Sequence, residues 1–455
     1  LEQSLHSESK VHVLAEHNRT SLSIPKELSN YSIGKLILID SEWWFITDNG
    51  VYICYVKNNE LLIKQHLFSG IFCTAVVKDR DDNYWISTLD SGVFIIPNIH
   101  INQLQLPQLL GAPSKTISVP DGKLLIGFKN GKALEYKIQD GTIRNLKTNS
   151  SFPVSALFYD SYRKEYLVIQ KIDNFRFNAN TLEPSSNSNL ISVKNLMLIH
   201  KDSMMSVSSQ HGRVSYYPKA GVDIASYSSI FMEKRGYSCM HDHRTGDRYF
   251  GMVDELAVYN TKNKKTIKYK GKNLLAKSII LGKDAGIWVA TFSNGIFYIQ
   301  QDRVVKHYDT NDGLLSDMVE QIALDGIYLW VVTKKGIQKF NTISGSFQNL
   351  TRRDGVLSYD ISDIIVEKNY VVFSSNDGLF SIDKERAFKK FRPLDVYLTS
   401  VEINEQRQEI LPFYELERDH SKLRISFNSN GYRGTSSGSY EYRMLGLEKK
   451  WNKII

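Results

Sequence analysis

Apolar and polar residues alternate along this chain in short runs, and polar or glycine-containing turns separate the runs. Alternation with a period of two residues is typical of β-strands that are buried on one face. No repeat shows the 3.6-residue period of two consecutive helices, which excludes helical repeats. The pattern therefore predicts an all-β protein built from short strands and tight turns.

The strand pattern recurs about nine times, with a period of about 41 residues. Each repeat opens with an apolar strand, and these strands begin near Gly34, Phe72, Ser114, Val154, Val193, Tyr237, Ala276, Val319 and Ile361. A unit of three or four strands cannot bury both of its faces alone, whereas radial stacking buries them and leaves only short edges. The repeat thus predicts the blades of a β-propeller.

A sharper motif lies in the second strand of the better-preserved repeats, where a Trp is followed by a Thr and then by a glycine. It occupies Trp44, Thr47 and Gly50; Trp85, Thr88 and Gly92; Trp288, Thr291 and Gly295; and Trp330, Thr333 and Gly336, with a worn version before Gly378. The indole suits a packing layer, Thr favours strands, and glycine supplies the positive φ of a tight hairpin. Because the Trp residues share one repeat position, we interpret them as packing between blades rather than as sugar platforms.

The repeat count exceeds the four to eight blades that are usual for one ring. A strand pair near residues 11–24 also looks like half of a tenth repeat. We therefore expect residues 113–393 to form one complete seven-bladed ring, and residues 1–112 to be blades of a first, partial propeller. Residues 394–455 lack the blade motif and contain only three or four strands, so we expect the start of an immunoglobulin-like β-sandwich in a fragment of a longer protein.

The formal net charge is +8, but the basic residues are dispersed. The densest cluster, residues 262–272, lies between two strand-like runs and is explained by a solvated hairpin. We therefore expect no contact with nucleic acid, whereas an anionic ligand or membrane surface is compatible with the charge. The three cysteines, Cys54, Cys73 and Cys239, are interpreted as buried free thiols. No apolar run is long enough to span a membrane.

Candidate chemistry is sparse. His241 and His243 would share one face of a strand, as two metal ligands would, but no third ligand lies nearby, so we interpret them as part of a solvated turn. The acidic turn at residues 79–83 lacks the spacing and the glycine of an EF-hand calcium loop. No nucleophile elbow, phosphate loop or zinc-protease motif occurs. We expect no metal, no cofactor and no catalytic residue.

Ligand contacts in a repeat protein are expected from loops that differ between units and lie on one rim. The candidates that the sequence offers are Arg352, Arg353, His307, Tyr308, Tyr216 and Tyr217.

Three segments carry a resemblance to two known families. Asp312–Leu350 and Asp354–Glu367 resemble the two-component regulator propeller repeat. The segment from Val396 onward resembles the triple-tyrosine domain that follows such propellers, and Tyr440, Tyr442, Gly446 and Trp451 match that domain's motif. Propeller repeats followed by a triple-tyrosine segment are typical of the periplasmic sensor region of membrane-anchored signalling proteins in Bacteroidetes-type bacteria.

This resemblance implies a periplasmic region that binds a small-molecule or oligosaccharide signal and forms a homodimer through its C-terminal domain. It also implies a membrane helix and a histidine kinase or DNA-binding output module beyond residue 455. Two alternatives stay open. A propeller lyase or glycosidase would require catalytic residues gathered at a central pocket, and a protein-binding scaffold would expose a large apolar patch on one rim.

Overall fold

The computed structural model of the chain describes residues 10–15, 18–107, 110–187, 190, 192–216, 227–260, 263–356, 360–388, 395–416, 422–430, 440–446 and 448–454. These residues form β-strands and turns, with 3-10 helices at η1 (Lys26–Asn30), η3 (Thr310–Asp312) and η4 (Arg352–Asp354). In this part of the chain, no helix is long and apolar enough to cross a membrane. The chain divides into two compact units, one of residues 98–388 and one of residues 1–97 with 389–455.

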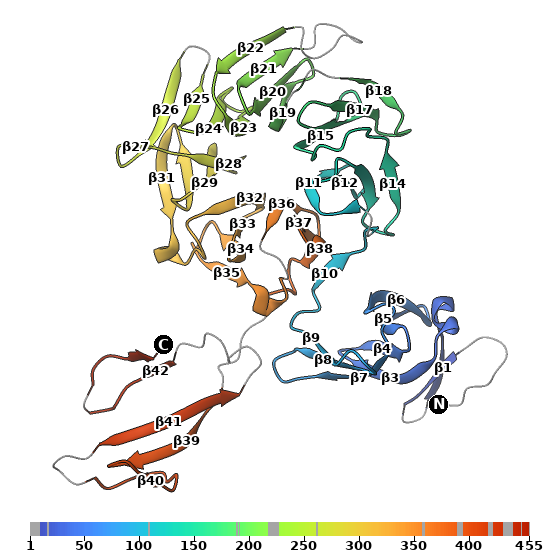
Figure 1. Cartoon of the computed structure of the whole chain (residues 1–455), viewed down its shortest axis with the longest axis vertical. Coiled ribbons are helices and arrows are strands. Elements are labelled where there is room, and N and C mark those ends of the chain that lie inside the picture. The colour runs from blue at the N-terminus through green and yellow to red at the C-terminus, as the bar shows by residue number, and fades with distance from the viewer. Residues whose placement is uncertain are drawn as a thin grey trace. The chain divides into compact units, whose positions relative to one another are not determined.

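The unit of residues 98–388 is a closed ring of seven antiparallel sheets, which confirms the predicted propeller (Figure 1). The first strand of each sheet lies nearest the centre and contacts the first strand of the next sheet around the ring. These inner strands are β11 (Pro113–Val119), β15 (Ala156–Asp160), β19 (Val193–His200), β23 (Gly236–His241), β28 (Ala276–Leu281), β32 (Val319–Asp325) and β36 (Ile361–Val366). Their starts agree with the predicted repeat starts to within two residues.

The outer strands of six blades follow their inner strand in sequence order, because turns this short join only antiparallel neighbours. They are β12 (Lys123–Phe128), β13 (Ala133–Lys137), β14 (Ile143–Leu146); β16 (Glu165–Ile169), β17 (Asn174–Asn178), β18 (Pro184–Asn187); β20 (Ser203–Ser208), β21 (Gly212–Tyr216), β22 (Tyr227–Met232); β24 (Arg248–Met252), β25 (Leu256–Tyr259), β26 (Lys264–Tyr269), β27 (Lys272–Asn273); β29 (Gly286–Thr291), β30 (Ile296–Gln300), β31 (Arg303–Tyr308); and β33 (Tyr328–Thr333), β34 (Gly336–Asn341), β35 (Phe347–Leu350).

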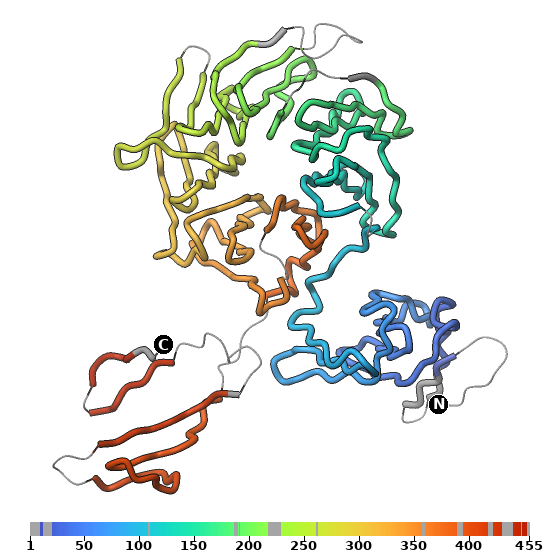
Figure 2. Tube along the Cα trace, in the orientation of Figure 1, coloured from blue at the N-terminus to red at the C-terminus, as the bar shows by residue number. Residues whose placement is uncertain are grey.

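The seventh blade is completed by a strand that precedes the first blade in sequence. β36, β37 (Tyr370–Ser375) and β38 (Gly378–Asp383) are joined by β10 (Ile101–Leu104), which pairs antiparallel with β38. In Figure 2 the light-blue segment containing β10 lies along the outer edge of the orange-red blade. The amide of Asn98 also donates to the carbonyl of Ala387 at 2.7 Å. The ring therefore begins at residue 98 and ends at residue 388, whereas the predicted bounds of 113 and 393 left β10 in the first propeller.

The hydrophobic core of the ring lies between neighbouring blades. Trp288 of the fifth blade is buried and meets Phe340 of the sixth at 5.9 Å between ring centroids, nearly edge-on. Trp330 occupies the same position one blade later and packs in a cluster with Val371 and Phe373 of the seventh. The indoles of the ring thus lie in the inter-blade layers, where large apolar area removed from water stabilises the ring.

The Thr and Gly of the motif close the turn between second and third strands. Thr291 Oγ1 donates to the Gly295 carbonyl at 2.8 Å and accepts from the Asn294 amide at 2.9 Å. Gly295 has a φ of +72°, and a Cβ there would overlap the carbonyl oxygen of Tyr308 at the end of the fourth strand. Gly92 lies in a sheet with no fourth strand among the described residues, and a Cβ added there would meet nothing within 4 Å. The glycine is therefore needed for two reasons: it adopts the positive φ of the turn, and its missing side chain leaves room for the fourth strand.

Residues 10–97 form two further sheets. The first contains β1 (Lys10–Ala15), β2 (Asn18–Ser23), β3 (Ile33–Ile39), β4 (Glu42–Thr47), β5 (Gly50–Lys57) and β6 (Glu60–Leu67), and the second contains β7 (Cys73–Lys78), β8 (Tyr84–Thr88) and β9 (Val93–Ile96). Trp44 stacks on Tyr84 between them, with ring centroids 4.8 Å apart. The hairpin β1–β2, interpreted from sequence as half of a tenth repeat, instead extends the outer edge of the first sheet. The three cysteines are buried and free, as predicted.

The C-terminal residues contain a three-stranded sheet and a separate hairpin. The sheet contains β39 (Asp395–Ile403), β40 (Gln406–Gln408) and β41 (Leu423–Asn430), and the hairpin contains β42 (Tyr440–Tyr442) and β43 (Asn452–Ile454). The hydroxyls of Tyr440 and Ser429 form a hydrogen bond of 2.6 Å. Apolar side chains of the sheet, among them Val396 and Leu398, are exposed. A β-sandwich covers such side chains with a second sheet.

Candidate ligand site in the central channel

The inner strands of the ring share a backbone irregularity at their second residue. In six of them the register shifts there, so that this residue is bulged out of the ladder with the second strand. A bulge redirects its side chain away from the ladder. The inner strands all begin at the same end of the ring, which we call the first rim. The bulged residues are Ser114, Lys194, Tyr237, Lys277, Glu320 and Ser362.

The seven blades divide into two groups at this position. In the first two, Ser114 and Ser155 donate to the carbonyls of Val154 and Val193, the residues next to the following bulge. These two serines therefore join one blade to the next, whereas Ser362 of the seventh blade bonds Ser374 of its own blade. The third to sixth blades carry larger polar or charged side chains instead. Such a difference between repeats at a shared position is the expected sign of ligand binding in a repeat protein.

The larger side chains form a continuous series of contacts across four blades. The ammonium of Lys194 lies 4.8 Å from the centroid of the Tyr237 ring, and Tyr237 meets Phe292 edge-on at 4.7 Å. The ammonium of Lys277 lies 5.4 Å from the Phe292 ring and pairs with the carboxylate of Glu320. Cations are attracted to the faces of aromatic rings. The first rim is therefore lined, across these four blades, by cationic and aromatic groups and by one carboxylate.

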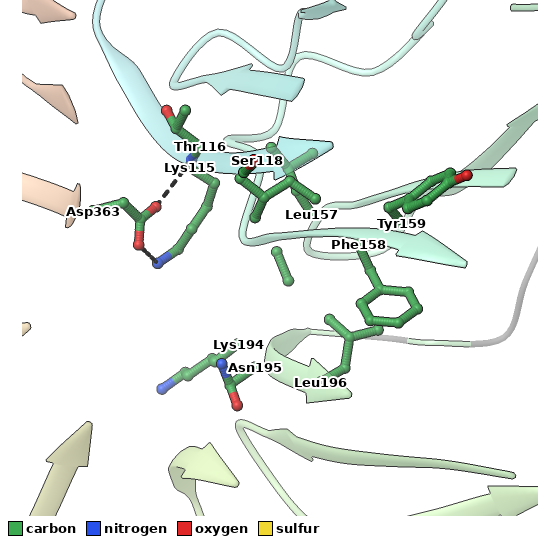
Figure 3. Close-up of a pocket in the computed structure, with 12 residues that line it drawn as sticks. Lys115, Thr116, Ser118, Leu157, Phe158, Tyr159, Lys194, Asn195, Leu196 and Asp363 are labelled. Atoms are coloured by element: carbon green, nitrogen blue, oxygen red, sulfur yellow. Dashed lines mark hydrogen bonds and ion pairs between the residues drawn. The ribbon is translucent and has the colours of Figure 1, made fainter. Parts of the chain in front are cut away.

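A cavity of about 350 Å³ adjoins this series at the inner strands of four blades. It is lined by side chains of β11, β15 and β19 and by Asp363 of β36 (Figure 3). Figure 3 shows Lys194 and Asn195 on one side of the cavity and the pair formed by Lys115 and Asp363 on the other. Phe158 and Tyr159 add aromatic surface. A concave site with apolar walls and a few polar groups is typical of small-ligand binding.

Asp363 and Asn195 hold equivalent positions and make equivalent bonds. Asp363 accepts from the backbone amide of Thr116 at 3.0 Å and from the ammonium of Lys115 at 3.3 Å. Asn195 accepts from the backbone amide of Cys239 at 3.1 Å. Each side chain thus joins its inner strand to the next one around the ring. Burial raises the pKa of Asp363 above the usual carboxyl range.

Lys194 contributes to both the cavity wall and the rim. Burial and the nearby Arg235 guanidinium lower the pKa of Lys194. The guanidinium carbon of Arg235 lies 5.4 Å from the same Tyr237 ring that Lys194 faces. Two cations therefore lie close to one aromatic ring at the first rim.

The ligand candidates chosen from sequence are dispersed, and the structure brings no more than adjacent pairs of them together. Arg352 and Arg353 lie in η4, on the loop that precedes β36 at the first rim. His307 is stacked on Phe297 at 4.4 Å. Tyr308 packs against Phe340 in the fifth inter-blade layer. Tyr216 is exposed at the end of a third strand, on the opposite rim, and Tyr217 lies outside the described residues.

Sequence reasoning missed Lys115, Lys194, Asn195 and Asp363 because it looked for variation in loops. The variable positions that line the cavity lie in the inner strands themselves. Comparing the second and third residues of the inner strands between repeats would have identified these positions. The second residue is serine in some repeats and Lys, Tyr or Glu in others.

The metal-like cluster lies at the end of a strand: His241 is the last residue of β23, and His243 is exposed in the turn that follows. Asp242 accepts from the Arg244 guanidinium, which reaches on to the carbonyl of Gly282 in the next blade at 2.8 Å. Arg244 lowers the pKa of Asp242 by hydrogen bonding to it. Among the described residues, no three His, Cys, Asp or Glu side chains are placed to hold a metal ion.

The acidic turn at residues 79–83 is closed by its own donors. The carboxylate of Asp79 accepts from the backbone amides of Asp81 and Asn83 and from the indole of Trp85. These donors lower the pKa of Asp79, although its burial opposes them. The turn thus caps a hairpin.

Comparison with known proteins finds similar folds among solved structures. No model of a known protein family and no curated protein matches the sequence. Among solved structures, the extracellular domain assigned to the hybrid two-component system BT3049 from B. thetaiotaomicron superposes on 95% of this chain and 64% of its own length, with a TM-score of 0.66 and 17% identity. That of BT4673 from the same organism covers 94% of this chain and 64% of its own length, with a TM-score of 0.52 and 13% identity.

The ring alone has a wider set of structural neighbours. The WD40 propeller domain of Doa1 covers 62% of this chain and 95% of its own length, with a TM-score of 0.51 and 14% identity. At these identities the similarity concerns the fold. The chain thus spans less than two thirds of the two extracellular domains, and its fold is similar to theirs over nearly its whole length.

Proposed function

We propose that the chain is the extracytoplasmic, ligand-sensing region of a membrane-anchored signalling protein of the two-component type. The observation that carries this proposal is the match in fold over 95% of the chain to an extracellular domain assigned to a hybrid two-component system. That match includes the ring and the segments on both sides of it, whereas an isolated propeller such as that of Doa1 covers only 62%.

The cavity lined by β11, β15, β19 and Asp363 is the proposed binding site for the signal. Its volume of about 350 Å³ is in the range of sites for small molecules. Ammonium groups, an amide and aromatic side chains line it, and these groups suit a hydroxyl-rich ligand such as a short oligosaccharide. The lining residues come from separate blades, so a ligand that contacts them all would tie those blades together.

The cavity favours binding over hydrolysis. Glycoside hydrolysis ordinarily requires two carboxyl groups on either side of the scissile bond. Among the described residues that line the cavity, Asp363 is the one carboxyl group, and it already bonds Lys115 and the Thr116 amide. This arrangement supports a sensor rather than a glycosidase.

We propose that signalling passes through the C-terminal residues. The exposed apolar side chains of β39 and β41, such as Leu398 and Ile425, support a domain completed by further strands and paired with a second copy. A membrane helix and a histidine kinase or related output module would follow residue 455. A ligand changes the output only if it binds one arrangement of the dimer more tightly than the other, by about 3–5 kcal/mol for a nearly complete switch.

Thermal unfolding of the chain with a panel of oligosaccharides tests this proposal. A ligand at about 100 times its dissociation constant stabilises the fold by about 2.7 kcal/mol. We expect a shift in melting temperature, with the sugar recovered intact by mass spectrometry. The variant Ser118→Trp, which fills the cavity wall, should abolish the shift, whereas Ser91→Trp on an exposed turn outside the ring should not. Cleaved sugar would instead favour an enzyme.

A further inference from the structure

The cations at the first rim differ in whether a carboxylate neutralises them. Lys115 is paired with Asp363 at 3.3 Å, and Lys277 is paired with Glu320. Among the described residues, by contrast, no carboxylate lies within ion-pairing distance of the Lys194 ammonium or the Arg235 guanidinium. The mouth of the channel therefore carries an excess of positive charge between the third and fourth blades.

Both uncompensated cations lie against one side chain. Lys194 and Arg235 lie 4.8 Å and 5.4 Å from the centroid of the Tyr237 ring. The attraction of each cation to the ring offsets part of the repulsion between them. The Tyr237 hydroxyl makes no hydrogen bond with the part of the chain that the structure describes. This group of three side chains thus offers two positive charges, an aromatic ring and a free hydroxyl.

The ring does not need Lys194 for closure. In the first two blades, serine at the bulged position donates to a carbonyl of the next blade, and beside Lys194 the Asn195 side chain instead accepts from the backbone amide of Cys239 in the next blade. A partly buried ammonium beside a guanidinium costs free energy, because both desolvation and like charge disfavour it. Burial and Arg235 lower the pKa of Lys194, in keeping with that cost. An anion bound between the two cations would remove the repulsion.

We infer that the ligand of the channel carries an oxyanion, such as the carboxylate of an acidic sugar, and that Lys194 and Arg235 receive this group while Tyr237 contacts the adjoining ring or hydroxyls. This inference rests on the proposed sensor function and names the chemical class of the signal. The cavity beside Lys194 would hold the uncharged part of the same ligand.

Binding of three probes to the whole chain tests the inference: glucuronate, its uncharged methyl ester, and inorganic sulfate. We expect glucuronate to bind more tightly than its ester and to bind less well as salt screens the charges. The variant Lys194→Gln should weaken glucuronate binding at least about tenfold, because a hydrogen bond to a charged group is lost. Arg235→Gln should weaken it as well.

Lys171→Gln is the matched control, since the ammonium of Lys171 also lies over an aromatic ring, that of Phe152 at 5.8 Å, but does not line the cavity. It should leave glucuronate binding unchanged. Binding of sulfate alone with the same dependence on Lys194 would identify a free oxyanion as the signal. Failure of both charged probes to bind, or equal binding of acid and ester, would overturn the inference. Neutral oligosaccharides that bind Lys194→Gln as well as the wild type would overturn it too, while leaving the sensor function intact.

Discussion

A single side chain position in the propeller repeat serves two purposes. At Ser114 and Ser155 the hydroxyl bonds the next blade and supports the ring. Where it holds Lys194 or Tyr237, the side chain lines the mouth of the channel. Neighbouring bonds, such as that from Asn195, hold the blades together at the substituted positions. The ring can therefore vary this position without losing closure.

The buried threonine of the turn motif should contribute more to the free energy of unfolding than its strand propensity suggests. Thr291→Val keeps the shape of the side chain. It leaves the backbone amide of Asn294 and the backbone carbonyl of Gly295 without their hydrogen-bond partner. We expect a loss of about 1–3 kcal/mol in the free energy of unfolding, measured by chemical denaturation. Thr88→Val makes the same change in a more exposed turn, where water replaces the hydroxyl, and should cost less than about 1 kcal/mol. Equal costs for the two variants would contradict this explanation.

Asp363 should make the stability of the ring depend on pH. Burial raises its pKa, so the folded chain holds this proton more tightly than the unfolded chain does. The carboxyl group therefore stabilises the fold below its ordinary pKa of about 3.9, and this contribution is lost as the pH rises through the raised pKa. Asp363→Asn can still accept from the Thr116 amide, as Asn195 does in its own blade.

The stability of Asp363→Asn relative to the wild type should therefore increase between pH 4 and pH 7. Urea denaturation at the two pH values measures the change. Asp121→Asn, in an exposed turn, should show no such increase. A relative stability that falls over this interval would show that the ion pair with Lys115 outweighs the burial of the carboxyl group.

At the scale of residues, the sequence predicts which side chains pack in the core better than it predicts which side chains line the candidate ligand site. The Trp positions follow from one repeat, and Trp44, Trp288 and Trp330 lie in layers between neighbouring sheets. The hydrogen bonds of Thr291 were not foreseen, because its strand propensity was a sufficient explanation. Asp363 and Lys194 were not foreseen because they are 169 positions apart in the chain and only ring closure brings them to one cavity.

At the scale of elements, β10 is the strand that the predicted bound at residue 112 separated from the ring. It follows β9 directly, as a fourth strand of that repeat would, but its four residues, Ile-Asn-Gln-Leu, do not alternate between apolar and polar. No local pattern therefore identifies the strand with which it pairs. The pairing with β38 follows only from closure of the ring, in which the last blade otherwise lacks its outer strand.

A chain that begins at residue 98 should therefore be more stable than one that begins at residue 113. The shorter chain loses the β10 ladder, the packing of Ile101 in the seventh blade and the bond from Asn98 to Ala387. We expect its melting temperature to be lower by about 10 °C, as the loss of a few kcal/mol implies in a domain of this size. Equal melting temperatures would mean that β10 does not close the ring in solution.

At the scale of the whole molecule, the ring gathers side chains from separate blades around one cavity. Each blade is held by its neighbours through buried aromatic layers, so the inner strands form a stable wall. The net charge of +8 is spread over the chain, but the mouth of the channel concentrates two uncompensated cations on one ring. The sequence predicted the charge and the ring, while the position of the charges required the fold.

The most direct test of the sensor proposal is a crystal structure of the chain with the oligosaccharide that most raises its melting temperature. The proposal predicts an intact ligand in the central channel, in contact with Lys194 and Asn195 and reaching toward Asp363. A ligand bound on the opposite rim, or on the first two sheets with the channel empty, would contradict it.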